Sequence, residues 1–461
     1  MDVIRANIVT IGDEIIAGDV VDTNRAYLGR RCRALGIDVI RGVSVRDRAA
    51  EIADVLVRCS RDVQICLVSG GLGPTTDDVT AEAVARAAGT RLVRDERVVG
   101  QLRAFFAERG GEMASSNLKQ ADLPQGCTVL DNPIGTAPGF SAEIGEDAGH
   151  SCTVICMPGV PRELRRMMAD QVEPRLLAGH GIRPVELRTY RFIGIGESKV
   201  QELIGSMGAR RDVADHLDHM FVHYRARALE VLVTFEYTGV DRSRGREALS
   251  VFDGPMHELF RRNLYGIGTA DLATRVVGAL TGAGLSVGVA ESCTGGLLGS
   301  MLTQVAGASA CFRGGVIAYD NGVKCAVLGI PAAALREHGA VSEHVAVAMG
   351  DRARSTIGTD LGVGITGIAG PSGGTPEKPV GTVHVAVTDT HGVSHKSLRA
   401  TGDRGDVRHH SAMWALKLVW DRLLDQGLAR VGELADPQPP TNEVHLKSPN
   451  LTFNTSDRIN S

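Results

Sequence analysis

The chain has 461 residues, of which 43% are hydrophobic and 23% are charged, and its formal net charge is −4 at pH 7. This length and composition predict a globular protein of two or three domains. The small net charge argues against a surface built to attract nucleic acid or an anionic membrane, and no run approaches the roughly 18 apolar residues of a membrane span.

The nine cysteines occur singly, mostly inside apolar runs, and the first residues lack the apolar core of a signal peptide. Both features favour a cytoplasmic protein with reduced, buried thiols. We therefore expect small-molecule partners, with neither a nucleic-acid nor a membrane partner.

Strand and helix patterns alternate over residues 1–177. Apolar runs predict strands and amphipathic runs predict helices. In chain order these are a strand at Ala6–Ile11, a helix at Thr23–Leu35, a strand at Asp38–Val45, a helix at Ala50–Cys59, a strand at Val63–Ser69 and a helix at Thr80–Ala88. Such alternation predicts an α/β domain with a parallel-type sheet and right-handed crossovers.

Two loops after strands of this first domain carry residues suited to a ligand. A Gly-rich turn between a buried strand and a helix can hold phosphate on its backbone, and neighbouring carboxylates can bind Mg²⁺ or cap the helix. The candidate residues are Gly70, Gly71, Gly73, Thr75, Asp77 and Asp78 in that turn, with Asp13 and Glu14 after the first strand. Asp77 and Asp78 are the candidate metal ligands, with helix capping as the alternative for at least one of them.

Residues 178–262 have a different pattern. Strands at Leu187–Ile193 and Leu229–Tyr237 flank a helix near Lys199–Gly205, which predicts a small α+β unit. The α/β alternation then restarts and predicts a second α/β domain over 263–434, with a helix that ends at Leu280 and a strand at Ser286–Ala290. The tail, 435–461, is rich in Pro, Asn and Ser and is predicted to be disordered.

Three loops of the second α/β domain follow strand-like segments, where the ligand crevice of an open α/β sheet lies. The first is the turn Ala290–Gly296, which precedes a helix and can hold an anion at the helix N-terminus. The second is the Gly-rich stretch Gly364–Gly374, whose glycines let a ligand approach the main chain closely. The third runs from Gly307 to Lys324. Each could also be ordinary packing or a surface loop, but their occurrence together favours a site.

The motifs AESCTGG, AGASACFRGGVIAYDNGVK, GAVSE and GITGIAGPSGGTPEKPVGTV occur in this order over residues 270–425. They resemble the C-terminal domain of the CinA family, which also occurs alone as nicotinamide mononucleotide deamidase. The resemblance implies hydrolysis of the carboxamide of nicotinamide mononucleotide to nicotinate mononucleotide and ammonia, in pyridine nucleotide salvage. The family is described as a serine amidase that uses Ser, Lys and Tyr, without a cofactor.

The resemblance implies that Ser309 is the nucleophile, Lys324 the base and Tyr319 a helper that relays a proton or orients the lysine. Ser292 is the rival nucleophile, because it occupies the turn between strand and helix. A lysine serves as a base only if burial or a nearby cation lowers its pKa from about 10.4. The other expected contacts, to phosphate or to an oxyanion, are Ser292, Thr294, Gly295, Gly367, Ala369 and Gly370, with Arg404 or Arg408 completing the site.

The first domain resembles the molybdopterin-binding (MoCF) domain shared by molybdenum cofactor enzymes and the N-terminal half of CinA. The resemblance implies binding of a phosphorylated pterin- or nucleotide-like ligand. It also implies an alternative function, metal-dependent cleavage of ADP-ribose, which would use a divalent cation at this domain. The middle segment resembles the KH-like unit of CinA, but its glycines lack the GXXG spacing of an RNA grip. A homodimer or larger homo-oligomer is implied, and a non-catalytic, competence-associated ligand-binding protein is a further alternative.

Overall fold

The structure, a computed structural model, describes residues 3–431 except 146–150, 183, 228 and 240. These residues form two compact units: the first consists of the described residues up to Leu187 together with Glu236–Ala248, and the second of Arg188–Phe235 and the described residues from Leu249 onward. The tail predicted to be disordered, 435–461, lies outside the described residues. No helix among those that are described has both the length and the apolarity needed to cross a membrane.

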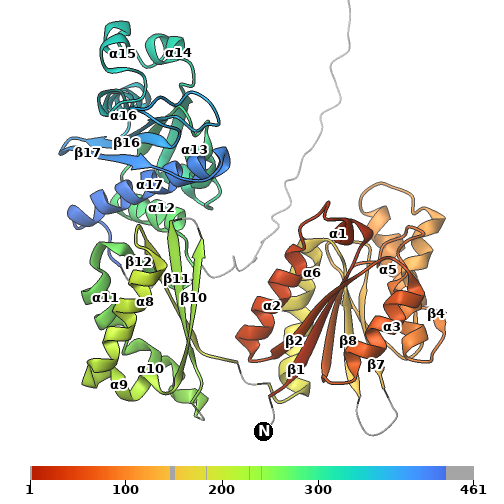
Figure 1. The fold of residues 1–461 in the computed structure, drawn as a ribbon. Helices are drawn as coiled ribbons and strands as arrows, with labels where there is room; N and C mark the ends of the chain where they lie inside the picture. The colour runs from red at the N-terminus through yellow and green to blue at the C-terminus, as the bar shows by residue number, and fades with distance from the viewer. Residues whose placement is uncertain (1–2, 146–150, 183, 228, 240, 432–461) are drawn as a thin grey trace, which may run out of the picture. The chain divides into compact units, whose positions relative to one another are not determined.

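The first unit is built on a six-stranded sheet in the order β2-β1-β3-β8-β7-β6 (Figure 1). The first four strands of this order are parallel, and β7 and β6 continue the sheet in antiparallel pairing. The strands are β1 (Arg5–Ile11), β2 (Asp38–Val45), β3 (Ile65–Ser69), β6 (Thr128–Leu130), β7 (Gly139–Ile144) and β8 (Cys152–Met157), with a separate pair of β4 (Leu92–Arg94) and β5 (Asp122–Pro124).

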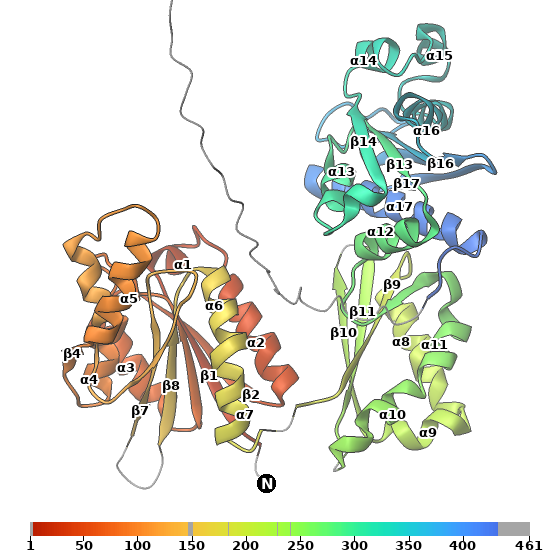
Figure 2. The same ribbon diagram turned by 180° about the vertical axis from the view of Figure 1, so that it is seen from behind.

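Alternating side chains of β3 explain why helices cover both faces of this sheet. Ile65 and Leu67 pack into one apolar cluster, and Cys66 and Val68 into the other, as the two-residue period of a strand requires. One face is covered by α2 (Thr23–Leu35), α6 (Pro161–Met167) and α7 (Glu173–Gly179), and the other by α3 (Ala49–Ser60), α4 (Thr80–Ala87) and α5 (Glu96–Ala107) (Figure 2). A short helix, α1 (Asp13–Ala17), follows β1.

The middle segment forms a four-stranded sheet in the order β10-β11-β9-β12, with its helices gathered on one side (Figures 1 and 2). Its strands are β9 (Leu187–Ile193), β10 (Met220–Arg227), β11 (Glu230–Tyr237) and β12 (Leu264–Ile267), and its helices are α8 (Glu197–Ser206), α9 (Arg211–Leu217), α10 (Gly245–Ser250) and α11 (Asp253–Phe260). Because β12 pairs with β9, this sheet extends past residue 262, where we expected the middle unit to end.

The C-terminal α/β domain has a five-stranded sheet in the order β14-β13-β15-β16-β17. The strands β14, β13 and β15 are parallel, whereas β16 and β17 are antiparallel. The strands are β13 (Val287–Glu291), β14 (Phe312–Ile317), β15 (Leu361–Gly367), β16 (Thr382–Asp389) and β17 (Gly392–Arg399). The mixed α/β class is thus confirmed for both domains, but the antiparallel edge strands were not predicted.

Helices cover both faces of this second sheet. The larger apolar core lies against α12 (Leu272–Ala283), α13 (Leu297–Thr303) and α17 (Arg404–Asp425), and the smaller one against α16 (Glu343–Ile357). A Cβ added at Gly364 would lie 2.0 Å from the Ala346 carbonyl oxygen of α16. Gly364 is therefore needed for the approach of a helix and not of a ligand, contrary to our expectation. The remaining helices are α14 (Asn321–Ala326) and α15 (Ala332–His338).

Candidate functional sites

The C-terminal domain has a pocket at the carboxyl ends of its three parallel strands. Ser292 follows β13, Tyr319 follows β14, and Thr366 and Gly367 end β15. Strand β13 lies between β14 and β15: the chain passes from β13 to β14 on one side and later returns to β15 on the other. Crevices of open α/β sheets form at such points. The cavity is about 180 Å³ and is lined by Ser292, Cys293, Tyr319, Asn321, Lys324, Ala340, Val341, Thr366, Gly367, Ala369 and Arg404.

Lys324 is the buried charge of this pocket. Its side chain is 2% exposed, and its Nζ lies 3.1 Å from Ser292 Oγ, 2.8 Å from the Ala318 carbonyl oxygen and 3.2 Å from the Tyr319 carbonyl oxygen. Burial lowers the pKa of Lys324, and the nearby Asp320 carboxylate partly opposes that shift. The geometry therefore joins a serine hydroxyl to a lysine that is driven toward its neutral form.

The turn that carries Ser292 is held by the carboxylate of the preceding residue. Glu291, the last residue of β13, accepts hydrogen bonds from the backbone N–H groups of Gly296, Leu298 and Gly299 at 2.8–3.1 Å. These are the orphan donors of the first turn of α13. Our expectation that this helix N-terminus holds a substrate anion is wrong, because a carboxylate of the chain already occupies it.

Two arginines at the start of α17 extend their side chains to the loops around the pocket. Arg404 donates to the Gly370 carbonyl oxygen at 2.7 Å and to the Tyr319 hydroxyl at 2.8 Å. Arg408 donates to the Thr294 carbonyl oxygen at 2.8 and 3.1 Å. Arg404 thus lines the cavity, whereas Arg408 does not line it and stabilises the turn that contains Ser292. This decides which arginine belongs to the pocket.

Cys293, beside the serine, is not a competing nucleophile. Burial raises the pKa of its thiol to about 12, so it stays protonated at neutral pH, whereas thiol attack requires the thiolate.

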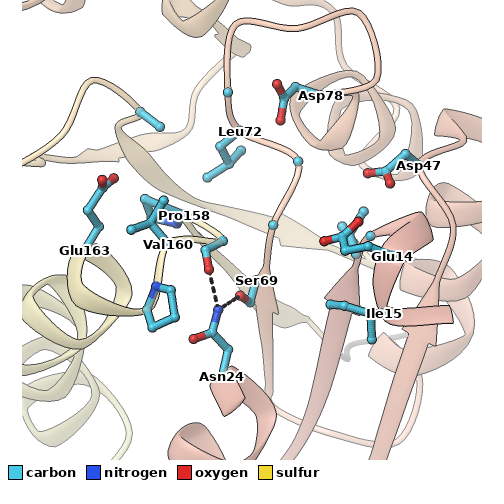
Figure 3. Close-up of a pocket in the computed structure, with 18 of the residues that line it drawn as sticks. Glu14, Ile15, Asn24, Asp47, Ser69, Leu72, Asp78, Pro158, Val160 and Glu163 are labelled. Atoms are coloured by element: carbon cyan, nitrogen blue, oxygen red, sulfur yellow. Dashed lines mark hydrogen bonds between the residues drawn. The ribbon is translucent and has the colours of Figure 1, made fainter. Parts of the chain in front are cut away.

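The N-terminal domain has a larger pocket, about 480 Å³, at the carboxyl ends of β1, β3 and β8. The glycine turn after β3 forms its floor. Figure 3 shows Glu14 and Asp47 on one flank of this turn and Glu163 on the other. Within the part of the chain that the structure describes, six carboxylates line the pocket and no lysine or arginine does; the acidic residues are Glu14, Asp22, Asp47, Asp77, Asp78 and Glu163.

The carboxylates of this pocket lie close enough to one another to raise the pKa of Asp47. Burial is the main reason why the pKa of Asp47 is raised, and Glu14, Asp13 and Asp77 raise it further, against a hydrogen bond from the Asp13 backbone N–H. Among the described residues, no group of three or more His, Cys, Asp or Glu side chains could hold a metal ion. A cation held by protein ligands alone does not fit, but Mg²⁺ commonly uses one or two carboxylates together with substrate phosphates, and this lining fits that mode.

Two buried amide side chains face this pocket with unused acceptors. Asn24 donates to Ser69 Oγ at 2.9 Å and to the Gly159 carbonyl oxygen at 2.7 Å (Figure 3), and Gln120 donates to Thr136 Oγ1 at 3.2 Å. Within the described part of the chain, neither amide oxygen has a hydrogen-bond partner. Both residues line the pocket, but the two oxygens are themselves buried from solvent, so a ligand in the pocket does not reach them as the side chains lie.

Comparison with known proteins now adds the family. The model described as "CinA C-terminal domain" matches residues 269–423, and the one described as "Probable molybdopterin binding domain" matches residues 7–178. A "Putative competence-damage inducible protein" of Symbiobacterium thermophilum is 39% identical over 430 residues, which cover 91% of this chain and 99% of that protein. This chain belongs to the CinA family.

Another relative and a solved structure have related names. A "CinA-like protein" of Anaeromyxobacter dehalogenans is 40% identical over 417 residues, which cover 90% of this chain and 98% of that one. The crystal structure titled "the protein CinA with unknown function from Thermoplasma acidophilum" is 33% identical and covers 37% of this chain and 96% of that one, with a TM-score of 0.34. None of these names states a reaction.

The predicted catalytic trio of this CinA chain is only partly assembled. Tyr319 and Lys324 line one pocket, together with the predicted Ser292, Gly367, Ala369 and Arg404. Ser309 does not: it is exposed in the turn Ala308–Ala310, before β14, whereas Tyr319 and Lys324 follow that strand. Six strand residues separate the two ends by about 20 Å. Our placement of Ser309 beside the lysine is wrong, and Ser292 occupies that position.

Three further predicted residues support this pocket without lining it. Thr294 is fully buried, and its carbonyl oxygen binds Arg408; Gly295 lies in the same turn, and the Gly370 carbonyl oxygen binds Arg404. In the N-terminal pocket the structure brings together Glu14, Gly70, Gly71, Gly73, Asp77 and Asp78. Thr75 instead donates its backbone N–H to Asp78 at 2.9 Å, and Asp13 forms an exposed ion pair with Arg46.

Sequence reasoning missed several lining residues. Asp47 directly follows the predicted strand Asp38–Val45, and its position after a parallel strand was a usable signal. Gln120 carried no such signal, because only the tertiary fold brings its segment to the pocket, whereas Ala340 and Val341 lie within the GAVSE motif and could have been identified from it.

Proposed function

We propose that the C-terminal pocket hydrolyses the carboxamide of nicotinamide mononucleotide to nicotinate mononucleotide and ammonia, with Ser292 as the nucleophile. The observation that carries this proposal is the 3.1 Å separation of Lys324 Nζ and Ser292 Oγ at a buried position. An amide is opened readily only by an activated nucleophile, and an adjacent base is the usual means of activating a serine.

The hydrogen bonds of Lys324 suit it to act as that base. A neutral amine has two N–H groups and one lone pair. The carbonyl oxygens of Ala318 and Tyr319 can accept both N–H groups, which leaves the lone pair for the Ser292 hydroxyl. Burial, which lowers the lysine pKa, favours this neutral state.

The reaction then proceeds in two halves. Ser292 Oγ bonds to the carboxamide carbon as its proton passes to Lys324, and the C–N bond breaks as Lys324 returns that proton to the departing ammonia. Water next attacks the resulting ester and gives a proton to Lys324. As the ester bond breaks, this proton passes to Ser292 Oγ, and the product leaves as the carboxylic acid, which gives its remaining proton to solvent and becomes nicotinate mononucleotide.

The size and charge of the pocket support a nucleotide whose reactive end alone is enclosed. At about 180 Å³ the cavity is smaller than the 300–1,000 Å³ usual for a whole ligand, so the ribose phosphate extends beyond it. Arg404 lies at the pocket and has five N–H donors, of which two are used by Tyr319 and Gly370. We assign it to the anionic part of the substrate.

The alternative, that this pocket binds a ligand without catalysis, is less well supported. A buried lysine whose charged form is disfavoured costs stability, and such groups concentrate at functional sites. The decisive assay measures ammonia release from nicotinamide mononucleotide by the full chain, with and without a chelator. We expect turnover that the chelator does not change. Absence of ammonia release by the folded protein would overturn the proposal.

A second candidate function concerns the N-terminal pocket, because its six carboxylates need a cation before a phosphorylated ligand can enter. We propose that it binds a phosphorylated nucleotide- or pterin-like ligand with Mg²⁺, and that ADP-ribose cleavage is its candidate reaction. Asp77 and Asp78 are the residues available to share the cation with ligand phosphates. Titration calorimetry with ADP-ribose, with and without Mg²⁺, tests this; binding that is equal in both conditions would contradict it.

A further inference from the structure

A second cavity adjoins the N-terminal pocket across a thin wall. It has a volume of about 310 Å³ and lies between α5 and the segment 131–138. Thr136 lines both cavities, with Ala137 lining the first and Gly135 and Pro138 the second. The wall is one segment of chain thick.

The wall is held in place by partly buried polar contacts. Asn132 donates to Glu163 Oε2 and to the Ala137 carbonyl oxygen, each at 2.8 Å. A Cβ added at Gly135 would lie 2.3 Å from the carboxyl carbon of Glu163, so the wall approaches the first pocket as closely as a glycine allows. Gln120, whose amide oxygen has no partner among the described residues, is bonded to Thr136 at this junction.

The second cavity differs chemically from the first. Apolar side chains supply much of its lining: Val98, Leu102, Ala104, Phe105, Pro133 and Pro138. The Arg109 guanidinium stacks on the Phe105 ring at 3.6 Å, which fixes the orientation of that ring. An apolar slot with an oriented aromatic ring suits a flat ring system.

Polar groups in the slot indicate what such a ring carries. Asp131 accepts hydrogen bonds from Arg97 at 3.2 Å and Gln101 at 3.1 Å, and its carboxylate has acceptor capacity left. Glu108 also lines the cavity, whereas no described lysine or arginine does. These acceptors suit ring amino groups and not phosphate, which is better served by backbone N–H groups and a cation at the glycine turn.

We infer that the two cavities form one bipartite site, in which the slot at α5 binds an amino-substituted heteroaromatic ring, a purine or a pterin, while the phosphorylated part of the same ligand lies in the glycine-turn pocket. This inference rests on the second function proposed above. It adds a subsite and a requirement: the ligand has two parts that span Thr136.

Filling the slot from its exposed side tests the inference. Ala104 is an exposed residue of α5 that lines the slot, and Ala107 is an exposed residue of the same helix that does not. In calorimetry with Mg²⁺, Ala104→Trp should weaken ADP-ribose binding about 10- to 100-fold, the range for loss of one base-stacking position. Binding of ribose 5-phosphate, which has no ring for the slot, should stay within about twofold.

Ala107→Trp should change neither affinity, and dihydroneopterin monophosphate in place of ADP-ribose shows whether a pterin uses the same slot. Two results overturn the inference: equal affinity of the unchanged protein for ADP-ribose and ribose 5-phosphate, or an Ala104→Trp variant that weakens both or neither. If the unchanged protein binds none of the three ligands, the phosphorylated-ligand function itself has failed, which is a distinguishable outcome.

Discussion

The two α/β domains place their pockets at the same topological position and give them opposite electrostatics. Each pocket lies at the carboxyl ends of three parallel strands. Among the described residues, the C-terminal one is lined by Lys324 and Arg404 and by no carboxylate, whereas the N-terminal one is lined by six carboxylates and by no lysine or arginine.

This difference separates what topology decides from what side chains decide. The sheet determines where a ligand can reach the chain. The residues at that point determine whether positive charge is supplied by the protein, as with Lys324, or by a cation that comes with the ligand, as we propose for the acidic pocket. One domain is thus suited to chemistry by its own side chains, and the other to binding through a shared metal ion.

Of the changes that test this contrast, replacement of Ser292 should have the largest effect on activity. Ser292→Ala removes the only hydroxyl bonded to Lys324 among the described residues, so we expect kcat for ammonia release to fall at least about 10⁴-fold, as for other serine nucleophiles. Ser309→Ala is the matched control and should stay within about twofold, because Ser309 is exposed at the other end of β14. If Ser309→Ala is the inactive variant, the site has been assigned to the wrong serine.

The pH dependence of the C-terminal activity tests the role of the lysine. Since burial lowers the pKa of Lys324, kcat/KM should rise about tenfold per pH unit and level off below the ordinary lysine pKa of about 10.4. The Asp320 carboxylate raises that pKa. Asp320→Asn, which keeps a side chain able to cap α14, should therefore move the midpoint to lower pH. A midpoint that stays in place or moves upward would refute lysine as the base.

The N-terminal side of the contrast is tested by removing one carboxylate. Asp78→Asn should weaken Mg²⁺-dependent ADP-ribose binding about tenfold, because a lost metal contact also loosens the turn held through Thr75. Ammonia release should not change. Asp54→Asn, at an exposed position of α3 outside the pocket, serves as the control. A parallel loss of both functions would mean that the two pockets are not independent.

Local pattern was sufficient to locate most elements of both domains. The helix Thr23–Leu35 and the strands Asp38–Val45 and Leu187–Ile193 have the predicted bounds, because each combines a clear periodicity with a capping or turn signal. Strands β6, β7, β16 and β17 were not identified. Their antiparallel direction could not be predicted either, because the pairing partner of a strand cannot be inferred from sequence spacing.

The proposed nucleophile shows more clearly what the sequence alone could not predict. Ser309 is closer in sequence to Lys324 than Ser292 is, yet β14 carries the chain away between them. The register of β13 beside β14, with Glu291 opposite Ile317, is what brings Ser292 next to the residues that follow β14. Register is a property of paired strands, and no single segment contains it.

The smallest effect should come from Tyr319, and it separates two roles for that residue. Lys324 contacts the Tyr319 carbonyl oxygen, whereas the phenol accepts from Arg404 at 2.8 Å and the side chain is 58% exposed. Tyr319→Phe keeps the carbonyl and the bond from Arg404 to Gly370. We therefore expect a loss of about tenfold or less in kcat/KM, seen mainly in KM, since the phenol would act by orienting the arginine that meets the substrate anion. A proton relay through the phenol would instead lower kcat by 10²-fold or more. Kinetics of Tyr319→Phe beside Arg404→Lys distinguish these cases: similar, KM-dominated losses support orientation, and a kcat loss confined to Tyr319→Phe shows that the phenol takes part in proton transfer.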